Sequence, residues 1–300
     1  MRAVGLRAWL QASRLPSQSY IALPLLLGQV VAVHTRGGSL ELGTLVAVQL
    51  FGLLDQLFIV YANDWADQET DARNQTATVF SGGSRVLVEG RLSARALGTA
   101  ALVCAGALLA LSCGLAVARG EPLLVPLAVA ALVLLWAYSY PPLRLSYRGG
   151  GEVLQMVGVA GVLPLYGYIA QGGELGSFPW ALLALLLPTH LGCAIATALP
   201  DEPSDRQSGK RTLPARMGGE RAVWVIVALN GLSLALAPVG LRAVGLSAGP
   251  WLLVPAVATL GVLGARPALP GSRGMLVRVA AAITATLALV ALPLLGLVVT

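Results

Sequence analysis

Residues 42–71 read LGTLVAVQLFGLLDQLFIVYANDWADQETD, an apolar stretch that runs directly into a cluster of acidic residues. An α-helix needs about 20 predominantly apolar residues to cross the hydrocarbon core of a bilayer, and residues 42–62 meet that length. Asp64, Asp67, Glu69 and Asp71 follow within the next nine residues. The stretch therefore predicts a transmembrane helix that carries a carboxylate-rich segment to one membrane surface.

Similar apolar stretches recur along the whole chain. Hydrophobic residues make up 56% of its 300 residues and charged residues only 11%, and the mean hydropathy is +0.77. Soluble domains carry about 25% charged residues, so a soluble protein is excluded. We expect one all-α integral membrane domain over residues 1–300, with about nine transmembrane helices at residues 16–33, 42–62, 95–117, 122–139, 153–171, 179–199, 221–239, 249–265 and 276–299.

The basic residues are distributed unevenly between the loops on the two sides of these helices. If the N-terminus is cytoplasmic, all but three of the 20 Lys and Arg residues fall on the cytoplasmic side, the exceptions being Arg36, Arg119 and Arg242. Cytoplasmic loops of membrane proteins carry such an excess of positive charge. The distribution predicts a cytoplasmic N-terminus and an external C-terminus, and it explains the net charge of +6 without a nucleic-acid partner.

Two long cytoplasmic connections, residues 63–94 and 200–220, each contain a short acidic cluster, and these two clusters together hold half of the 14 acidic residues. The first connection follows the second predicted span and the second follows the sixth, an offset of four helices. This offset predicts two pseudo-repeated four-helix halves with an added ninth helix. Such membrane folds often place their site between the halves, which would bring the two acidic clusters face to face.

The first cluster has the spacing of a metal-binding helix end. Asn63, Asp67 and Asp71 follow at four-residue intervals and form one helical stripe, with Asp64 beside it. Like charges on one helix face repel each other, so we expect a bound cation. Hard oxygen ligands of this kind suit Mg²⁺, which also bridges to substrate phosphates.

The second cluster combines carboxylates with cations. Asp201 and Asp205 repeat the four-residue spacing, and Lys210 follows within ten residues of Asp201. A diphosphate bridged by a metal ion needs both groups, because the metal neutralises its oxygens and Lys or Arg donates charge-assisted hydrogen bonds. The two clusters together predict a magnesium-dependent site for a diphosphate.

Among the polar residues inside the predicted spans, three bear on the site. Gln56 precedes Asn63 by seven residues and therefore shares its helix face, so Gln56 should line the cavity beside the metal. Asp55 is either functional, as ionisable residues within spans often are, or a satisfied polar contact between helices. His190, in the sixth span, is either a packing hydrogen bonder or a base.

These motifs resemble the UbiA-type intramembrane prenyltransferase superfamily over nearly the whole chain. The resemblance rests on the segment 63–71, on the segment 201–213, and on Tyr140-Pro141-Pro142-Leu143-Arg144, where Arg144 stands in place of the usual Lys. The Arg guanidinium is planar and can bind a phosphate through two N–H groups at once, whereas the Lys ammonium is a single charge on a flexible side chain. Both bind phosphate.

The resemblance implies a polyprenyltransferase in a bacterial or archaeal-type cell membrane, with its active site facing the cytoplasm. Its metal ligands would be Asn63, Asp67, Asp71, Asp201 and Asp205, and the four aspartates are the expected catalytic residues. The expected substrate-binding residues are Asn63, Asp64, Arg85, Tyr140, Arg144, Arg148, Lys210 and Gln56. The implied partners are a polyprenyl diphosphate, an aromatic acceptor and the lipid bilayer.

Two further stretches resemble the 1,4-dihydroxy-2-naphthoate polyprenyltransferases of menaquinone biosynthesis. They are FSGGSRVLVEG at residues 80–90 and YRGGGE at residues 147–152. The resemblance implies that dihydroxynaphthoate accepts the prenyl group and that the product is a demethylmenaquinone.

Three alternatives stay open. The same fold could act on another aromatic acceptor, or it could be an intramembrane terpene cyclase, in which the allylic cation closes on its own chain. A cation transporter could also use paired acidic motifs on repeated halves. Its acids should lie near the bilayer midplane, however, whereas these lie at span ends beside Lys210 and Arg211.

Overall fold

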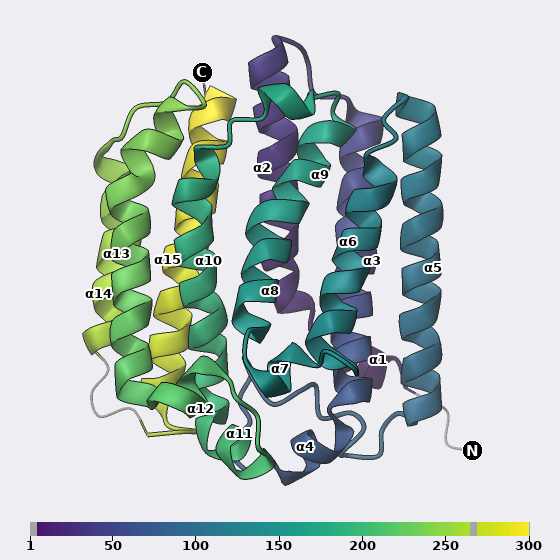
Figure 1. The fold of residues 1–300 in the computed structure, drawn as a ribbon, viewed down its shortest axis with the longest axis vertical. Coiled ribbons are helices and arrows are strands. Elements are labelled where there is room, and N and C mark those ends of the chain that lie inside the picture. Colours follow the sequence, from purple (N-terminus) through teal and green to yellow (C-terminus); the bar gives the residue numbers. More distant parts are fainter. Residues whose placement is uncertain (1–4, 265–268, 300) are drawn as a thin grey trace.

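The computed structural model describes residues 5–264 and 269–299 and is almost entirely helical. Its long helices run roughly side by side along the longest axis of the molecule (Figure 1). Within the described residues, the only β feature is an isolated bridge between Thr78 and Ser81. The prediction of an all-α protein is therefore confirmed. Arg2 and Arg266, which entered the topology prediction, lie outside the described residues, as does the C-terminal Thr300.

The long helices coincide with the predicted apolar spans. Seven helical stretches in the described part of the chain are long and apolar enough to cross a membrane. They contain α2 (Ser19–Arg36), α3 (Leu42–Ala66), α5 (Ala94–Arg119), α8 to α9 (Gly151–Ala170), α10 (Leu182–Ala198), α13 (Gly219–Arg242) and α15 (Arg273–Val299). The fourth and eighth predicted spans are shorter apolar helices, α6 (Leu124–Ser139) and η5 with α14 (Pro250–Leu252 and Leu253–Gly264). A multi-pass membrane protein is thus supported, and the count of nine spans stays a prediction.

The fifth predicted span contains a wide turn. It comprises α8 (Gly151–Val157), a π-helical turn η2 (Gly158–Val162) and α9 (Leu163–Ala170). Pro164 has no N–H group to donate to the preceding turn, and single π turns accommodate such interruptions within a helix. The Gly and Pro residues therefore widen this helix locally and do not end it.

Close helix contacts hold the centre of the bundle together. A Cβ atom at Gly28 in α2 would overlap the carbonyl of Pro164, and one at Gly167 in α9 would overlap the carbonyl of Leu25. Only glycine allows two helix backbones to approach this closely, as is common between membrane helices. Nearby, the rings of Phe51 in α3 and Tyr166 in α9 stack with their centroids 3.8 Å apart.

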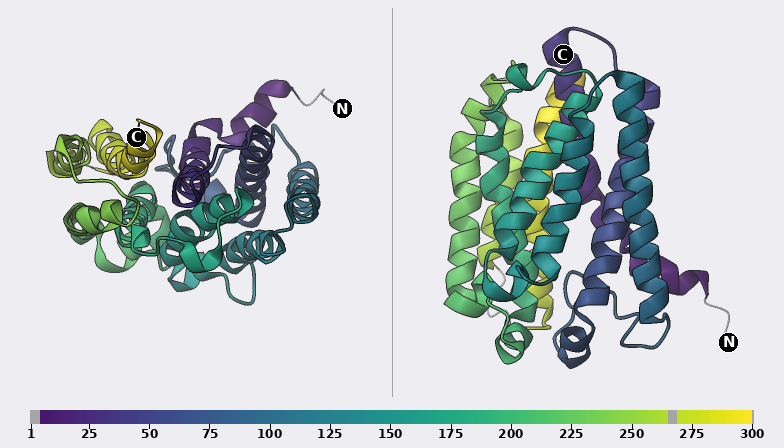
Figure 2. Two further views of the ribbon diagram at one scale, coloured as in Figure 1. Left: turned by 90° about the horizontal axis from the view of Figure 1, so that it is seen from above. Right: turned by 45° about the vertical axis from the view of Figure 1, so that its right-hand side comes forward.

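Short helices gather at the end of the bundle drawn lowest in Figure 1. They are α1 (Leu6–Ser13), α4 (Gln68–Arg73), α7 (Leu145–Arg148), α11 (Glu202–Ser208) and α12 (Leu213–Met217). Two 3-10 turns, η1 (Leu15–Gln18) and η4 (Leu199–Asp201), lead from this end into α2 and out of α10, and a third, η3 (Leu175–Ser177), follows α9. Figure 2 shows the bundle from above, with α5 at one edge and α14 at the opposite edge. The two acidic connections therefore meet at one end of the molecule.

Candidate active site

The first aspartate cluster is built where α3 ends. Asn63 and Asp64 lie in the last turn of α3, Asp67 links α3 to α4, and Asp71 lies within α4. Asp64, Asp67 and Asp71 are all buried. Because a buried carboxylate is costly unless it is hydrogen-bonded or paired, the partners of these groups define what the site can do.

Asp64 holds the glycine-containing part of the first loop. Its carboxylate accepts hydrogen bonds from the backbone N–H of Ser84, at 3.1 and 3.2 Å, and from the Ser84 hydroxyl. Arg14 also contacts it at 3.3 Å. Gly83 has a left-handed φ of +72°, and a Cβ atom there would overlap the carboxylate of Asp71. The loop backbone can therefore approach the carboxylates only because this residue is glycine.

The second aspartate cluster contacts the first directly. The ammonium group of Lys210 donates to Asp67 Oδ2 over 2.8 Å. Asp201 accepts from the side chain of Asn74 at 2.7 Å and from the backbone N–H of Gly82 at 3.0 Å. The structure thus brings two segments about 130 residues apart in the sequence into one hydrogen-bonded unit.

Asp205, in α11, is the last of the clustered carboxylates. It is buried, and its Oδ2 atom accepts a hydrogen bond of 2.8 Å from the Thr212 hydroxyl. The backbone N–H of Lys210 donates to the Asp205 carbonyl at 2.9 Å, which closes the turn after α11. This turn places the Lys210 side chain against Asp67.

Tyr147 is a site residue that the sequence reasoning missed. Its hydroxyl donates to Asp67 Oδ1 at 2.9 Å and lies 2.6 Å from the Thr70 hydroxyl. The guanidinium carbon of Arg144 lies 3.6 Å from the centroid of its ring, and Lys210 Nζ lies 4.8 Å from it. Tyr147 therefore touches the first motif, the Arg144 turn and the second motif at once. Its sequence signals were its position three residues after Arg144 and its place at the start of the segment 147–152.

Arg144 and Tyr140 occupy different surroundings despite sharing a motif. Arg144 adopts a left-handed backbone with φ of +43°, which turns its side chain onto Tyr147. Its Nε atom is buried and has no hydrogen-bond partner within the described residues. The Tyr140 hydroxyl instead donates to the Ala62 carbonyl at 2.7 Å and braces the end of α3.

The other predicted substrate-binding residues are placed less centrally. The guanidinium of Arg85 donates to the backbone carbonyls of Asp71 and Asn74, so it braces the first loop. Gln56 donates to the Ser17 hydroxyl, on the side of η1. Arg148 is exposed. Asn63 accepts a hydrogen bond of 3.2 Å from Ser139 in α6.

The charges of the site are strongly coupled. Burial raises the pKa of the Asp71 carboxyl to about 7, and the neighbouring charges of Asp67 and Asp64 add to this effect. Burial alone would lower the pKa of Lys210, but the adjacent Asp67 and Tyr147 raise it well above its usual value. The site therefore strongly stabilises the positive charge of Lys210. Asp71 has too little positive charge nearby to keep its usual pKa.

The donor set fits a magnesium ion chemically. The two clusters contribute five carboxylates, those of Asp64, Asp67, Asp71, Asp201 and Asp205, of which Asp64 pairs with Arg14 and Asp67 with Lys210. Such an excess of oxygen ligands and negative charge suits Mg²⁺. Within residues 5–264 and 269–299, however, no three His, Cys, Asp or Glu side chains are close enough to hold one ion. Protein donors, such as Lys210 and Tyr147 at Asp67, contact the carboxylates instead.

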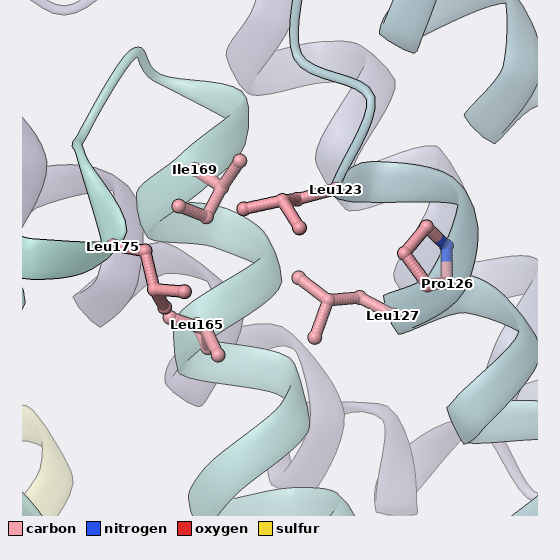
Figure 3. A pocket seen from close by; sticks show the side chains of 6 residues that line it. All are labelled: Leu123, Pro126, Leu127, Leu165, Ile169 and Leu175. Atoms are coloured by element: carbon pink, nitrogen blue, oxygen red, sulfur yellow. The ribbon is translucent and has the colours of Figure 1, made fainter.

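A separate groove of about 200 Å³ opens between α6 and α9 (Figure 3). Its lining is entirely apolar and consists of Leu123, Pro126, Leu127, Leu165, Ile169 and Leu175. Leu123 and Pro126 lie at the end of α6 opposite Tyr140. The groove has no group for diphosphate chemistry and is distinct from the aspartate site.

Comparison with known sequences gives a consistent family. The sequence model of the UbiA prenyltransferase family matches residues 21–273. The chain is 31% identical over 239 residues, 78% of its length, to protoheme IX farnesyltransferase of Thermus thermophilus. It is 32% identical over 170 residues, 55% of its length, to chloroplastic chlorophyll synthase of Oryza sativa subsp. japonica. These matches cover 37% and 43% of the two relatives, so the chain spans less than half the length of the curated relatives it matches.

Solved structures share the fold. An apo UbiA homolog from Aeropyrum pernix K1 superposes with a TM-score of 0.71 at 18% identity, covering 92% of this chain and 96% of that one. A UbiA homolog from Archaeoglobus fulgidus bound to GPP and Mg²⁺ gives 0.69 at 16% identity, covering 97% and 99%. The predicted family is therefore confirmed, whereas a dihydroxynaphthoate-specific member is not singled out by these matches.

Proposed function

Because this chain belongs to the UbiA prenyltransferase family, we propose that it transfers a polyprenyl group from an allylic diphosphate to an aromatic acceptor with the help of Mg²⁺. The observation that carries this proposal is the contact between Lys210 and Asp67, which joins the two aspartate motifs into one site. A cation transporter needs no lysine at that point, because a bound cation would be repelled by it. A diphosphate explains why carboxylates and a lysine lie together.

The carboxylates and the cationic side chains would have different roles at the diphosphate. Bound at Asn63, Asp67, Asp71, Asp201 and Asp205, Mg²⁺ would neutralise negative charge on the diphosphate oxygens. Lys210 and Arg144, which both contact the Tyr147 ring, would donate charge-assisted hydrogen bonds to the same oxygens. These donors stabilise the charge that develops as the bond between C1 of the prenyl chain and the diphosphate oxygen breaks.

The new carbon–carbon bond would join a ring carbon of the acceptor to C1 of the prenyl chain. An electron-rich ring carbon attacks C1, and the ring then loses a proton to restore its aromaticity. Dihydroxynaphthoate is our proposed acceptor, on the strength of the segments 80–90 and 147–152. Its carboxylate leaves as CO₂, and the ring carbon that carried it takes up a proton in its place. The matches to relatives named for haem and chlorophyll make a tetrapyrrole the acceptor to test beside it.

The membrane arrangement follows from the charge distribution. We infer nine spans, a cytoplasmic N-terminus and an active site on the cytoplasmic side of a cell membrane. The isoprenoid tail would extend between the helices toward lipid, where each buried CH₂ contributes about 0.8 kcal/mol.

Incubating purified protein with a labelled polyprenyl diphosphate and Mg²⁺ tests this function. The incubations should contain dihydroxynaphthoate, a tetrapyrrole acceptor, or no acceptor. We expect prenylated naphthoate product that depends on Mg²⁺. Product with the tetrapyrrole alone would reassign the acceptor, and a hydrocarbon formed without acceptor would show a terpene cyclase.

A further inference from the structure

The second aspartate motif continues into a stretch of chain without regular secondary structure. Residues 210–212 lie between α11 and α12 and form neither helix nor strand. Two of their side chains nevertheless reach the carboxylates, because Lys210 donates to Asp67 and Thr212 donates to Asp205, each over 2.8 Å. The turn after α11 fixes the first of these residues, but the two that follow need another support.

This support comes from residues 147–152, the segment that leads from α7 into α8. The backbone N–H of Arg211 donates to the carbonyl oxygen of Tyr147 at 3.1 Å. The backbone N–H of Leu213 donates to Oε1 of Glu152 at 2.6 Å. Both ends of the segment 147–152 therefore hold the backbone that follows the second motif.

Two glycines in the middle of this segment allow the close contact. Gly149 and Gly150 have φ values of +95° and +105°, which glycine adopts without strain. A Cβ atom at Gly149 would lie 3.4 Å from the carbonyl oxygen of Arg211, so the two chains pack closely there. The glycines thus let Tyr147 and Glu152 bind residues that are only two positions apart in the facing chain.

The contacts alternate along this facing chain. Lys210 and Thr212 direct their side chains to the carboxylates, whereas Arg211 and Leu213 are held through their backbone N–H groups. Thr212 has an extended backbone, with φ of −59° and ψ of 154°, and successive residues of extended backbone point to opposite sides. A displacement of the backbone at residue 211 or 213 would therefore move both side chains that contact the carboxylates.

Glu152 supplies the only side-chain atom in these two backbone contacts. It is 5% exposed, and it forms no ion pair within the part of the chain that the structure describes. A buried carboxylate is costly unless it is hydrogen-bonded. Its donor, Leu213, is the first residue of α12, and the first N–H groups of a helix have no partner within that helix. One hydrogen bond therefore satisfies both groups.

We propose that Glu152 is a positioning residue of the diphosphate site, which fixes Lys210 and Thr212 by holding the backbone of residues 211–213. This inference rests on the proposed function. Glu152 makes no hydrogen bond to the clustered aspartates within the described residues and acts through Lys210 and Thr212. Its contribution is therefore made at the diphosphate and is the same for every acceptor.

Trypsin cleavage of the full-length, metal-free protein measures the position of this chain directly. Arg211 is exposed, and cleavage at its bond to Thr212 reports local opening of the backbone. Glu152→Met keeps the length of the side chain and removes the acceptor oxygen. Cleavage should then be about tenfold faster than in wild type, the factor equivalent to one hydrogen bond. Glu152→Gln keeps an acceptor oxygen and should stay within about threefold of wild type.

Binding and kinetics test the link to the diphosphate. The concentration of Mg²⁺ with inorganic diphosphate that gives half of the maximal rise in melting temperature should increase about tenfold in Glu152→Met. KM for geranylgeranyl diphosphate should rise by a similar factor, and KM for dihydroxynaphthoate or a tetrapyrrole acceptor should not change. In a Lys210→Met background, Glu152→Met should cost less than about threefold more, because the side chain that it positions is already absent.

Ser146→Ala is the matched control. It removes a buried hydrogen bond from the neighbouring helix α7, in which the Ser146 hydroxyl donates to the carbonyl oxygen of Tyr138 at 2.7 Å, without a contact to the second motif. Cleavage after Arg211 and binding of Mg²⁺ with diphosphate should stay within about threefold of wild type. Equal effects of Ser146→Ala and Glu152→Met would show a general loosening of this region and would overturn the positioning role.

The remaining outcomes distinguish this role from the function on which it rests. An active wild type together with a Glu152→Met variant that matches it in cleavage, diphosphate binding and KM would overturn the positioning role alone. A loss confined to KM for the acceptor, or equal impairment of Glu152→Gln and Glu152→Met, would do the same. A wild type that neither binds Mg²⁺ with diphosphate nor prenylates any acceptor would overturn the proposed function, whatever the cleavage rates show about the chain after Lys210.

Discussion

Replacing Tyr147 by Phe removes one hydroxyl from the centre of the site and keeps the ring. The hydroxyl donates to a buried carboxylate, Asp67, at 2.9 Å. A hydrogen bond to a charged group contributes about 1.5 to 3 kcal/mol, and each 1.4 kcal/mol is a factor of ten. If the bond holds Asp67 in its working orientation, kcat/KM for the prenyl diphosphate should fall by about 10- to 100-fold. More Mg²⁺ should also be needed for half-maximal rate.

A second variant separates the hydroxyl from the ring. Tyr147→Leu also removes the surface that carries Arg144 and Lys210, so it should raise KM for the diphosphate beyond the value for Tyr147→Phe. Tyr166→Phe is the matched control, because it removes a buried hydroxyl that bonds to Ser112 at 2.9 Å, away from the aspartates. If Tyr147→Phe and Tyr166→Phe have equal kinetics and equal magnesium dependence, the positioning role of Tyr147 is refuted.

Three further predictions concern charge and topology. Arg144→Lys should keep most activity, whereas Arg144→Ala should raise KM for the diphosphate by a factor equivalent to about 1 to 3 kcal/mol; steady-state kinetics decide, and an unchanged KM would reduce Arg144 to a topology-setting charge. The pKa of Asp71 is raised to about 7, so the folded protein binds a proton there that the unfolded chain releases above pH 4. Metal-free protein should therefore lose thermal stability as pH rises from about 5 to 8, and Asp71→Asn should flatten the dependence in melting curves recorded in EDTA; parallel curves would contradict the assignment. Tags at Gln75 and Ser208 should be accessible only from the cytoplasm and one after Thr300 only from outside, and an external Ser208 would overturn the nine-span topology.

Apolar length and charge spacing were enough to predict the helical bundle. Every predicted span falls on a helix, because twenty apolar residues in a row can satisfy their backbone in lipid only as a helix. Within the fifth predicted span, residues 158–162 form a π turn. Sequence alone cannot tell whether neighbouring helices stabilise such a turn or end the helix there.

The site was predicted in its charges but not in its geometry. The acidic stripes pointed to Asp67 and Asp205, and Lys210 followed from the adjacent cation. Tyr147 could not be predicted, because its place depends on the left-handed backbone of Arg144 and on a loop from the other half of the chain. Arg85 was expected near the diphosphate, yet it binds backbone carbonyls, which is a matter of local loop geometry.

The central claim is that two aspartate motifs about 130 residues apart act as one magnesium–diphosphate site. Asp67→Asn and Asp205→Asn keep the size of each side chain and remove one charge, and neither residue is adjacent to the other in the chain. Each variant should lower kcat/KM by about a hundredfold or more, the scale of losing a preorganised electrostatic stabiliser, and should require more Mg²⁺.

The deciding measurement is kcat/KM of the double variant over a magnesium titration, beside both single variants and wild type. Residues that act as a unit show strongly non-additive losses, so the double variant should lose far less than the product of the two single losses. Losses that multiply, or full activity of either single variant at the magnesium concentration that wild type needs, would contradict a shared site.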